Sequence, residues 1–493
     1  MKENLQLSKS KTLRGLVCPL SLWHEIYNSE EWQKEEDISY KVYSSIQIKE
    51  IQALARKKFQ KGEFAENLIS LKNLKEVNFP IYNLNLSFEN FHTQIDILVT
   101  THLGWEIYIV KPIAKLKKEI FLEMAYHSFI AKESGWKISA TKILFINSNY
   151  FFEKEIDLEE YFKVEDVTEK ILPIQANLKK QLLNLKTYLH KTPTEVKEIP
   201  KCNTPKTCRN PKLCWKELPN LSVFELRESG AILEFLLEKK IHTWTQIPED
   251  LELSFSQKVQ IQCSIHQKPH IDKKMISEFL EKIQYPLYFL DFETINPPLP
   301  VYPQTKPFQH IPFLYYLFCK HSTHSSLEEF YFIDDFQSDP RKKILDKLSK
   351  EISKGSIICY NDLIEKRCLK EAVEIYPEYK EWYETIKDQF IDISQPFREF
   401  WYYHPAQKGS ASLKAVLTPL TGLSYNNLDI KDGGTANFEF LKLKLNPTFT
   451  PIQEETLEKL KFYCRMDAFA INKILEKLKE LDSSVEFLLV EKN

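Results

Sequence analysis

Glycine is scarce in this chain, which has only ten glycines in 493 residues, whereas average proteins contain about 7%. None of them forms GxGxxG or GxxxxGK[ST], the patterns whose backbone N–H groups surround the phosphates of dinucleotides and nucleoside triphosphates. The sequence therefore offers no basis for a Rossmann cofactor or a P-loop, and it disfavours a motor that hydrolyses ATP.

Long apolar runs and an excess of one charge are also missing. No uninterrupted apolar segment is long enough to span a bilayer, and the first twenty residues lack the apolar core of a secretory signal. We therefore expect a cytoplasmic protein without a membrane partner, whose nine cysteines are mostly reduced. Because the net charge is −2, any contact with nucleic acid must come from local patches.

The length indicates more than one domain, since a single compact core rarely extends over 493 residues. Alternating helical and strand-like patterns predict an α/β protein. Residues 91–110 read as two strands joined at 102–104, followed by a helix from Lys115 to about Ser134. Five prolines interrupt residues 191–219. We predict domains over 1–220 and 284–485, joined by a connecting region at 221–283.

The second predicted domain opens on PLYFLDFET, an apolar run typical of a buried strand. SIICYN predicts another strand, which leads directly into helical sequence. The clearest helix is the last one. Thr450 suits its N-cap, Pro451 its first position, and Gln453 completes a capping box. We expect this helix to extend to about Leu481.

Four residues of these elements carry candidate chemistry. Asp291 and Glu293 are two apart on a strand and therefore share a face, and Tyr463 and Asp467 are four apart on a helix and share one too. Carboxylates buried side by side are costly unless cations neutralise them. Mg²⁺ or Mn²⁺ suits such oxygen ligands. Two ions about 3.5–4 Å apart can stabilise the attacking and leaving oxygens of phosphodiester hydrolysis.

The segments FLDFET and YCRMD resemble the outer motifs of the DnaQ-like 3′→5′ exonucleases of the DEDDy type, which have an RNase H-like fold. Their middle motif is an Asn, three residues and an acid, and here Glu365 follows Asn361 at that spacing. Asp362 and Asp392 are alternatives for this acid. A single DxE or YxxxD is commonly a pair of solvated acids, but their joint occurrence in this order favours an active site.

This resemblance implies a hydrolase that uses two Mg²⁺ or Mn²⁺ ions to digest nucleic acid. We rank DNA before RNA as the substrate, although no short motif distinguishes the two. The implied metal ligands are Asp291, Glu293, Glu365 and Asp467, and Tyr463 completes the catalytic set. HPAQKGSASLKAVL resembles the segment that positions substrate in this fold, where Lys414 would meet a phosphate. Gly433 and Gly434 permit a tight turn or a close backbone approach, and a plain loop explains them equally well.

Three cysteines, Cys202, Cys208 and Cys214, have C-x5-C-x5-C spacing within the proline-rich stretch. Zinc sites usually contain closer pairs, whereas four thiolates are a common ligand set for an iron–sulfur cluster. Cys18 is the fourth candidate. Ordinary reduced cysteines and a zinc site are the alternatives.

One N-terminal cysteine with three more beyond the nuclease core resembles the iron–sulfur RecB-like (PD-(D/E)XK) nucleases. This resemblance implies a restriction-endonuclease fold whose ends are joined by a 4Fe-4S cluster. The whole order, a RecB-like domain followed by a DnaQ-like one, resembles a bacterial family called a domain of unknown function.

The RecB-like active site departs from its pattern, which is an Asp on one strand and Glu-x-Lys on the next. Asp96 and Lys111 match, but Ile109 stands where the Glu belongs. Glu106 is five residues from Lys111 and should lie on the opposite strand face. His127 and Ala131 stand at the Gln and Tyr positions of the following helix.

We therefore expect a degenerate first domain that binds nucleic acid or holds the exonuclease in place. Residues 201–216 carry five basic residues and no acid, which suits phosphate contact and equally a solvated charge run. The rival function is a non-catalytic nucleic-acid-binding or scaffold protein with two relic sites. The intact outer motifs favour the enzyme.

Overall fold

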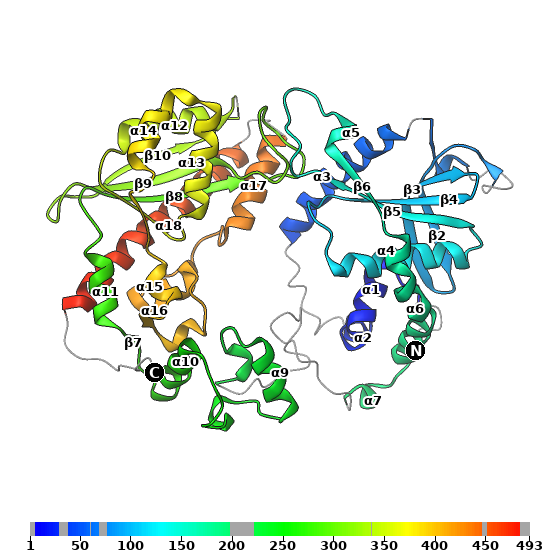
Figure 1. The fold of residues 1–493 in the computed structure, drawn as a ribbon, viewed down its shortest axis with the longest axis horizontal. Helices are drawn as coiled ribbons and strands as arrows, with labels where there is room; N and C mark the ends of the chain where they lie inside the picture. The colour runs from blue at the N-terminus through cyan, green and yellow to red at the C-terminus, as the bar shows by residue number, and fades with distance from the viewer. Residues whose placement is uncertain are drawn as a thin grey trace. The chain divides into compact units, whose positions relative to one another are not determined.

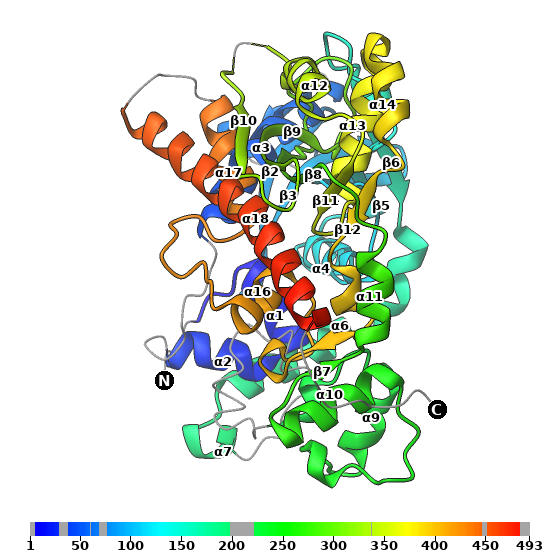
Figure 2. The same cartoon turned by 90° about the vertical axis from the view of Figure 1, so that its left-hand side faces the viewer.

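The chain divides into two compact units, residues 1–201 with 297–309 and residues 202–296 with 310–493 (Figures 1 and 2). This computed structural model describes residues 5–28, 38–59, 61–68, 76–197, 221–336, 338–445 and 451–483. Both units are mixed α/β, as the sequence predicted. None of the helices in these ranges is long and apolar enough to cross a membrane.

The first unit is built on a six-stranded sheet in the order β1-β2-β3-β4-β5-β6. Its strands are β1 Glu63–Phe64, β2 Ile81–Phe88, β3 Phe91–Thr101, β4 Gly104–Lys111, β5 Ile138–Ile146 and β6 Phe162–Asp166. β3 and β4 pair antiparallel, so the predicted pair of strands joined at 102–104 is confirmed. β4 and β5 pair parallel, with α4 as the crossover.

Helices cover both faces of this sheet. They are α1 Lys9–Val17, α2 Pro19–Tyr27, α3 Ile38–Lys58, α4 Lys118–Glu133, α5 Leu158–Tyr161, α6 Thr168–Leu189 and α7 Pro193–Lys197, with the 3₁₀ turn η1 Ala65–Leu68. α4 and α6 bury apolar residues against one face, and α3 packs Ile51 and Ala55 against the other. The predicted helix after the second strand is α4, which begins three residues later than expected.

The second unit begins with short helical elements, some of which pack against the later segment around Tyr402–Tyr403. They are η4 Val223–Glu225, α9 Gly230–Glu238, η5 Trp244–Gln246, α10 Phe255–His266 and α11 Lys273–Leu280. β7 His270–Ile271 pairs with β13 Tyr402–Tyr403, and the amide of Gln260 on α10 donates to Glu225 O at 2.7 Å. Residues 221–283 therefore pack within the second unit. The domain boundaries predicted at 220 and 284 stay predictions.

The main sheet of this unit has the order β10-β9-β8-β11-β12. The strands are β8 Leu287–Ile295, β9 Ile311–Lys320, β10 Glu328–Ile333, β11 Ser356–Cys359 and β12 Phe390–Asp392. β8 pairs antiparallel with β9 and parallel with β11, which makes the predicted strand around Asp291 the centre of the sheet. Its side chains at 288, 290 and 292 enter one core, so Asp291 and Glu293 face the other way.

Helices cover both faces of this sheet too (Figure 1). They are α12 Pro340–Glu351, α13 Leu363–Ile375, α14 Lys380–Ile386, α15 Gln395–Arg398, α16 Leu413–Thr421, α17 Gly433–Leu445 and α18 Pro451–Ser483, with the turns η6 Pro377–Tyr379 and η7 Pro405–Gln407. α12 and α13 pack on the core face, while α17 and α18 contact β8. The predicted last helix is confirmed, and Thr450 lies outside the described residues.

Candidate metal centre

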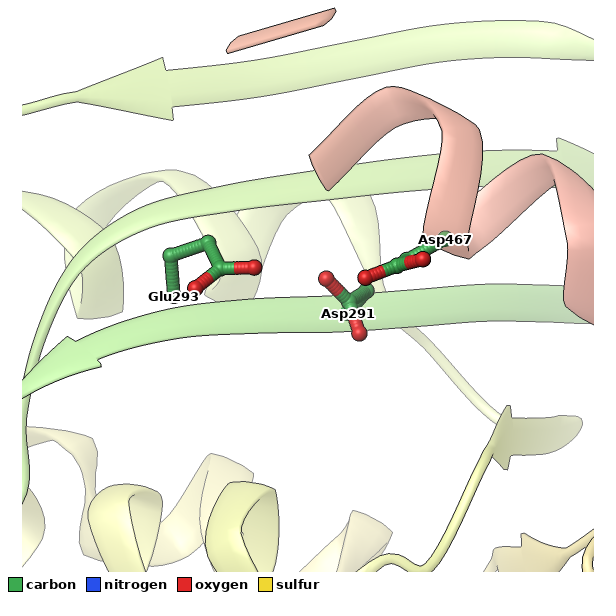
Figure 3. A group of neighbouring side chains, drawn as sticks. All are labelled: Asp291, Glu293 and Asp467. Atoms are coloured by element: carbon green, nitrogen blue, oxygen red, sulfur yellow. The ribbon is translucent and has the colours of Figure 1, made fainter. Parts of the chain in front are cut away.

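Strand β8 and helix α18 bring three carboxylates together (Figure 3). One oxygen each of Asp291, Glu293 and Asp467 lies within 4.8 Å of the others. Asp291 and Glu293 project from the same face of β8, and α18 packs against β8 and β9, which places Asp467 over them. The two motifs thus meet in space as the sequence predicted, while the catalytic role of these residues stays a prediction.

Burial makes the negative charges of this trio costly. Glu293 is 6% and Asp467 7% exposed, whereas Asp291 is half-buried. The pKa values of Asp291 and Glu293 are raised well above the usual range, mainly by burial and to a smaller extent by the neighbouring carboxylates. Burial raises the pKa of Asp467 to about 6, opposed by hydrogen bonds from tyrosines. Cations beside these groups would stabilise their ionised forms.

Glu365 adds a fourth buried acid in the first turn of α13. It is 6% exposed, and burial raises its pKa to about 8 although backbone N–H groups, including that of Phe292, donate to it. Its charge in turn raises the pKa of Asp291 and Glu293. Its Oε2 atom is buried and has no hydrogen-bond partner in the part of the chain that the structure describes. An unpaired buried carboxylate oxygen calls for an explanation, and a divalent cation bound beside it would supply one.

The two alternative middle acids are engaged elsewhere. Asp362 forms an ion pair with Lys366 at 2.5 Å. Asp392 accepts hydrogen bonds from the backbone N–H groups of Asn361 at 2.8 Å and Ser394 at 2.9 Å, and it pairs with Arg398. Asp392 therefore fixes the loop after β11. These contacts favour Glu365 as the middle acid.

Two tyrosines and a lysine surround Asp467. Tyr463, one turn earlier on α18, hydrogen-bonds to the Asp467 carboxylate, and the Tyr425 hydroxyl donates to the same carboxylate. Lys414 on α16 places its Nζ 5.2 Å from the ring centre of Tyr425 and 5.5 Å from that of Tyr463. Its positive charge lowers the pKa of Glu293 and Asp467. Lys414 is therefore at the site, as the sequence suggested.

Tyr425 and Cys464 were missed by sequence reasoning. Tyr425 is 42 residues from Asp467 in a segment without a periodic pattern, so no spacing pointed to it. Cys464 lies inside the YCRMD motif, and its thiol donates to Asp291 Oδ2 at 3.3 Å. Burial raises the pKa of Cys464 far above the usual range, so it remains a neutral donor. Both residues hold a carboxylate of the trio in place.

The Gly433–Gly434 pair begins α17 and does not form a tight turn. Asp432 caps this helix, accepting from Thr435 N at 2.9 Å. A Cβ atom on Gly433 would lie 3.8 Å from Glu293 Oε2, an ordinary contact distance. The backbone thus comes near the acidic trio without requiring glycine there.

In the first unit, Asp96 and Lys111 are bound by other protein groups. Asp96 accepts from Val110 N at 2.8 Å and from the Gln52 amide at 3.1 Å. Lys111 donates to Glu123 Oε1 at 2.6 Å. Glu123 lies on α4, twelve residues after Lys111, and sequence reasoning missed it because the pattern searched for an acid on β4.

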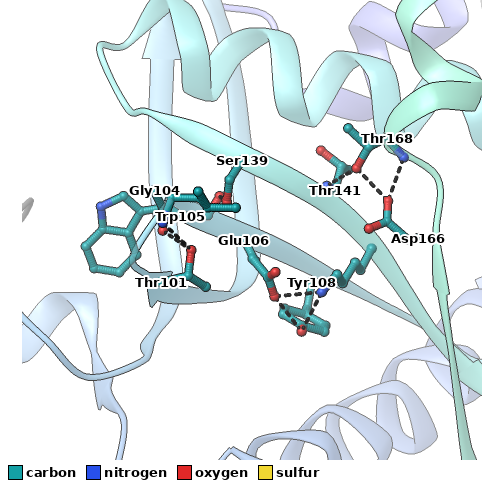
Figure 4. A network of polar contacts seen from close by, with 11 residues as sticks. Thr101, Gly104, Trp105, Glu106, Tyr108, Ser139, Thr141, Asp166 and Thr168 are labelled. Carbon is teal, nitrogen blue, oxygen red and sulfur yellow. Dashed lines mark hydrogen bonds and ion pairs between the residues drawn. The ribbon is translucent and has the colours of Figure 1, made fainter.

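The residue at the acid position of the RecB-like pattern, Ile109, belongs to the buried core in this structure. Ile109 is 2% exposed and packs with the apolar residues under α4. Glu106 turns instead toward Tyr108, whose hydroxyl donates to it at 2.8 Å (Figure 4), and it also pairs with Lys142 at 2.8 Å. The prediction that Glu106 lies on the opposite face from Lys111 is confirmed.

The cysteine prediction falls mostly beyond the described part of the chain. Cys202, Cys208 and Cys214 lie outside the described residues, as does the basic stretch 201–216. Cys18 is the N-cap of α2, where its sulfur accepts from Ser21 N at 3.4 Å. The four-thiolate cluster therefore stays a prediction.

One comparison with known proteins gives a match. A family described as Domain of unknown function (DUF2779) matches residues 288–412. This range holds Asp291, Glu293 and Glu365 but ends before α18 and Asp467. The predicted resemblance to a family called a domain of unknown function is confirmed to that extent. No curated protein and no solved structure matches the chain.

Proposed function

We propose that the second unit is a divalent-metal-dependent nuclease that hydrolyses phosphodiester bonds as a 3′→5′ exonuclease, on DNA rather than RNA. The observation that carries this proposal is the trio of Asp291, Glu293 and Asp467, whose ligand oxygens lie within 4.8 Å of one another. The mixed sheet with the acid-bearing β8 at its centre is compatible with the RNase H-like fold that the motif resemblance implies. The 3′→5′ direction rests on that resemblance.

The donor set fits hard divalent cations. Asp291, Glu293, Asp467 and Glu365 would hold Mg²⁺ or Mn²⁺, because all four offer carboxylate oxygens. The Oε2 atom of Glu365, which has no hydrogen-bond partner among the described residues, and the raised pKa values of the four acids agree with a site that cations would stabilise. When bound, two such ions stabilise the attacking and leaving oxygens of phosphodiester hydrolysis.

The neighbouring side chains have separate roles in this proposal. The Tyr463 hydroxyl, which hydrogen-bonds to the Asp467 carboxylate, orients the attacking water. Tyr425 donates to the same carboxylate and holds Asp467 when Tyr463 engages that water. The Lys414 ammonium beside both rings attracts a substrate phosphate. Cys464 fixes the orientation of Asp291 through its hydrogen bond.

A digestion experiment tests this function. The purified protein is incubated with 5′-end-labelled single strands of DNA and RNA in Mg²⁺, Mn²⁺ or EDTA. We expect metal-dependent shortening from the 3′ end of DNA, and resistance of a strand whose 3′ terminus is blocked. Asp291→Asn should lose most activity, because it removes a charge that offsets the cations, while the exposed Asp388→Asn serves as the matched control.

Two results would contradict the proposal. One is equal digestion by the protein and Asp291→Asn, which would indicate a contaminating nuclease or a different site. The other is no digestion by either in any metal. Strand binding without digestion would support the rival function, a non-catalytic nucleic-acid-binding or scaffold protein.

A further inference from the structure

The first unit contains a cavity of about 610 Å³ that the proposed nuclease centre does not use. The start of α1, the helix α3 and the strands β2 to β4 line it. Its size is within the range of small-molecule sites, about 300–1,000 Å³. Most of the residues that line it are polar, and they include Lys9, Lys111, His92, Gln94 and Asn85.

Two lysine ammonium groups of this wall share one carboxylate. Lys9 Nζ lies 2.5 Å and Lys111 Nζ 2.6 Å from the same oxygen, Glu123 Oε1. Burial raises the pKa of Glu123, but hydrogen bonding from His127 and the two ammonium groups outweigh it and hold this pKa far below the usual range. One oxygen of Glu123 thus engages both ammonium groups. Each ammonium has three N–H donors, so donors remain for a ligand.

Two other titratable groups of the wall, Asp96 and His127, are engaged with protein groups. Asp96 uses both oxygens to accept, from Val110 N and from Gln52, and burial raises its pKa. His127 is 1% exposed, and burial lowers its pKa to about 4, so it is neutral near pH 7. Lys9 and Lys111 therefore offer this wall charged N–H donors that are left for a ligand, which favours an anion.

The start of α1 adds backbone donors to the same wall. Ser8 is the N-cap and Lys9 the first residue of this nine-residue helix, and Ser8, Lys9 and Ser10 all line the cavity. The first N–H groups of a helix have no acceptor within it and attract anions. Leu7 fixes this end beside β3, since Leu7 N donates to Asn90 O at 2.8 Å and His92 N to Leu7 O at 3.0 Å.

We propose that this cavity binds a phosphorylated ligand of nucleotide size, with the phosphoryl group on Lys9, Lys111 and the first turn of α1. The amides of Asn85 and Gln94 then face the remainder of the ligand. Asp96 and Lys111 thus belong to an anion site and not to a metal site, because the protein's own donors occupy the carboxylates of Asp96 and Glu123. This inference concerns the first unit and stands independently of the exonuclease activity.

Calorimetric titration of the full chain tests the proposal. The Asp291→Asn variant is used to prevent digestion, in buffer freed of metals by a chelating resin, since soluble chelators are themselves anions. The probes are inorganic phosphate, a nucleoside 5′-monophosphate, and a dinucleotide with a 5′-phosphate or a 5′-hydroxyl. We expect saturable binding of the monophosphate and of the 5′-phosphorylated dinucleotide. If the monophosphate binds more tightly, the ligand is a free nucleotide. If the phosphorylated dinucleotide binds more tightly, the ligand is the 5′ end of a strand.

Variants locate the binding. In the Asp291→Asn background, Lys9→Met should weaken monophosphate binding at least tenfold, and Lys9→Arg should restore part of it. Lys11→Met, two residues further along α1 with a 43% exposed side chain, should leave it unchanged. Unchanged thermal melting shows that Lys9→Met is folded. The proposal fails if neither phosphorylated probe binds, if the 5′-hydroxyl dinucleotide binds as tightly as its phosphorylated form, or if Lys9→Met binds like its parent.

Discussion

Replacing Glu365 by Gln should stabilise the metal-free protein at pH 8 and abolish most of its stabilisation by metal. The pKa of Glu365 is about 8 in the folded protein and 4.5 ordinarily. The folded state therefore holds this proton more tightly than the unfolded chain, so the free energy of unfolding falls as pH rises from 4.5 to about 8.

The size of the effect follows from that difference. Relative to a side chain that does not titrate, Glu365 lowers the free energy of unfolding by about 4 kcal/mol at pH 8 and by only about 1 kcal/mol at pH 5. Gln avoids this cost but buries an amide without a full set of partners, which costs about 1–3 kcal/mol. We expect a net gain of about 2 kcal/mol at pH 8 and none at pH 5.

Differential scanning calorimetry measures this directly. A gain of about 2 kcal/mol should raise the melting temperature of a unit of this size by about 4–8 °C at pH 8 in metal-free buffer. Mn²⁺ should then stabilise the wild type markedly and Glu365→Gln much less, because binding to the folded state alone adds stability. Glu374→Gln, an exposed acid on the same helix, is the control. A variant less stable than wild type at pH 8 without metal, or one equally stabilised by Mn²⁺, would refute the reasoning.

Three further predictions address the remaining roles. Tyr463→Phe should reduce nuclease activity less than Asp291→Asn does, by about 10²-fold or less, as single-turnover digestion of the labelled strand would show; an equal loss would mean that the hydroxyl does more than orient water. Lys111→Ala should leave nuclease activity nearly unchanged, because Lys111 pairs with Glu123 and Ile109 provides no ligand; loss of cleavage by a folded variant would mean that the first unit cleaves. Protein purified without oxygen should be brown and contain iron that Cys208→Ser removes, as metal analysis and visible absorbance would show, whereas stoichiometric zinc without iron would indicate a zinc site instead.

The parts of the site that the sequence predicted depend on short-range geometry. Asp291 and Glu293 share a face because a strand repeats every two residues, and Tyr463 and Asp467 do so because a helix nearly repeats every four. The strand β8 and the helix α18 were therefore predictable from their own residues. Their meeting in space was predictable only through the resemblance, since no local pattern fixes how a helix packs on a sheet.

The residues that the sequence did not reveal act over long separations. Tyr425 reaches Asp467 across 42 residues, and Lys9 reaches Glu123 across 114. Each contact depends on the packing of whole elements, α18 with α16 and the segment after it in one unit, and α1 with α4 in the other. Cys464 lies within the YCRMD motif, but its role could not be predicted from the sequence, because the role of a thiol depends on which carboxylate it faces.

The central claim is that the trio of Asp291, Glu293 and Asp467, together with Glu365, holds two divalent cations. Titration with Mn²⁺ followed by electron paramagnetic resonance tests it most directly, because free Mn²⁺ gives a strong signal that binding depletes. We predict that the wild type binds two Mn²⁺ ions close enough for their spins to couple. Asp291→Asn should lose that coupled pair, while Asp388→Asn should keep it. Absence of saturable Mn²⁺ binding to the wild type, or identical binding by Asp291→Asn, would contradict the account.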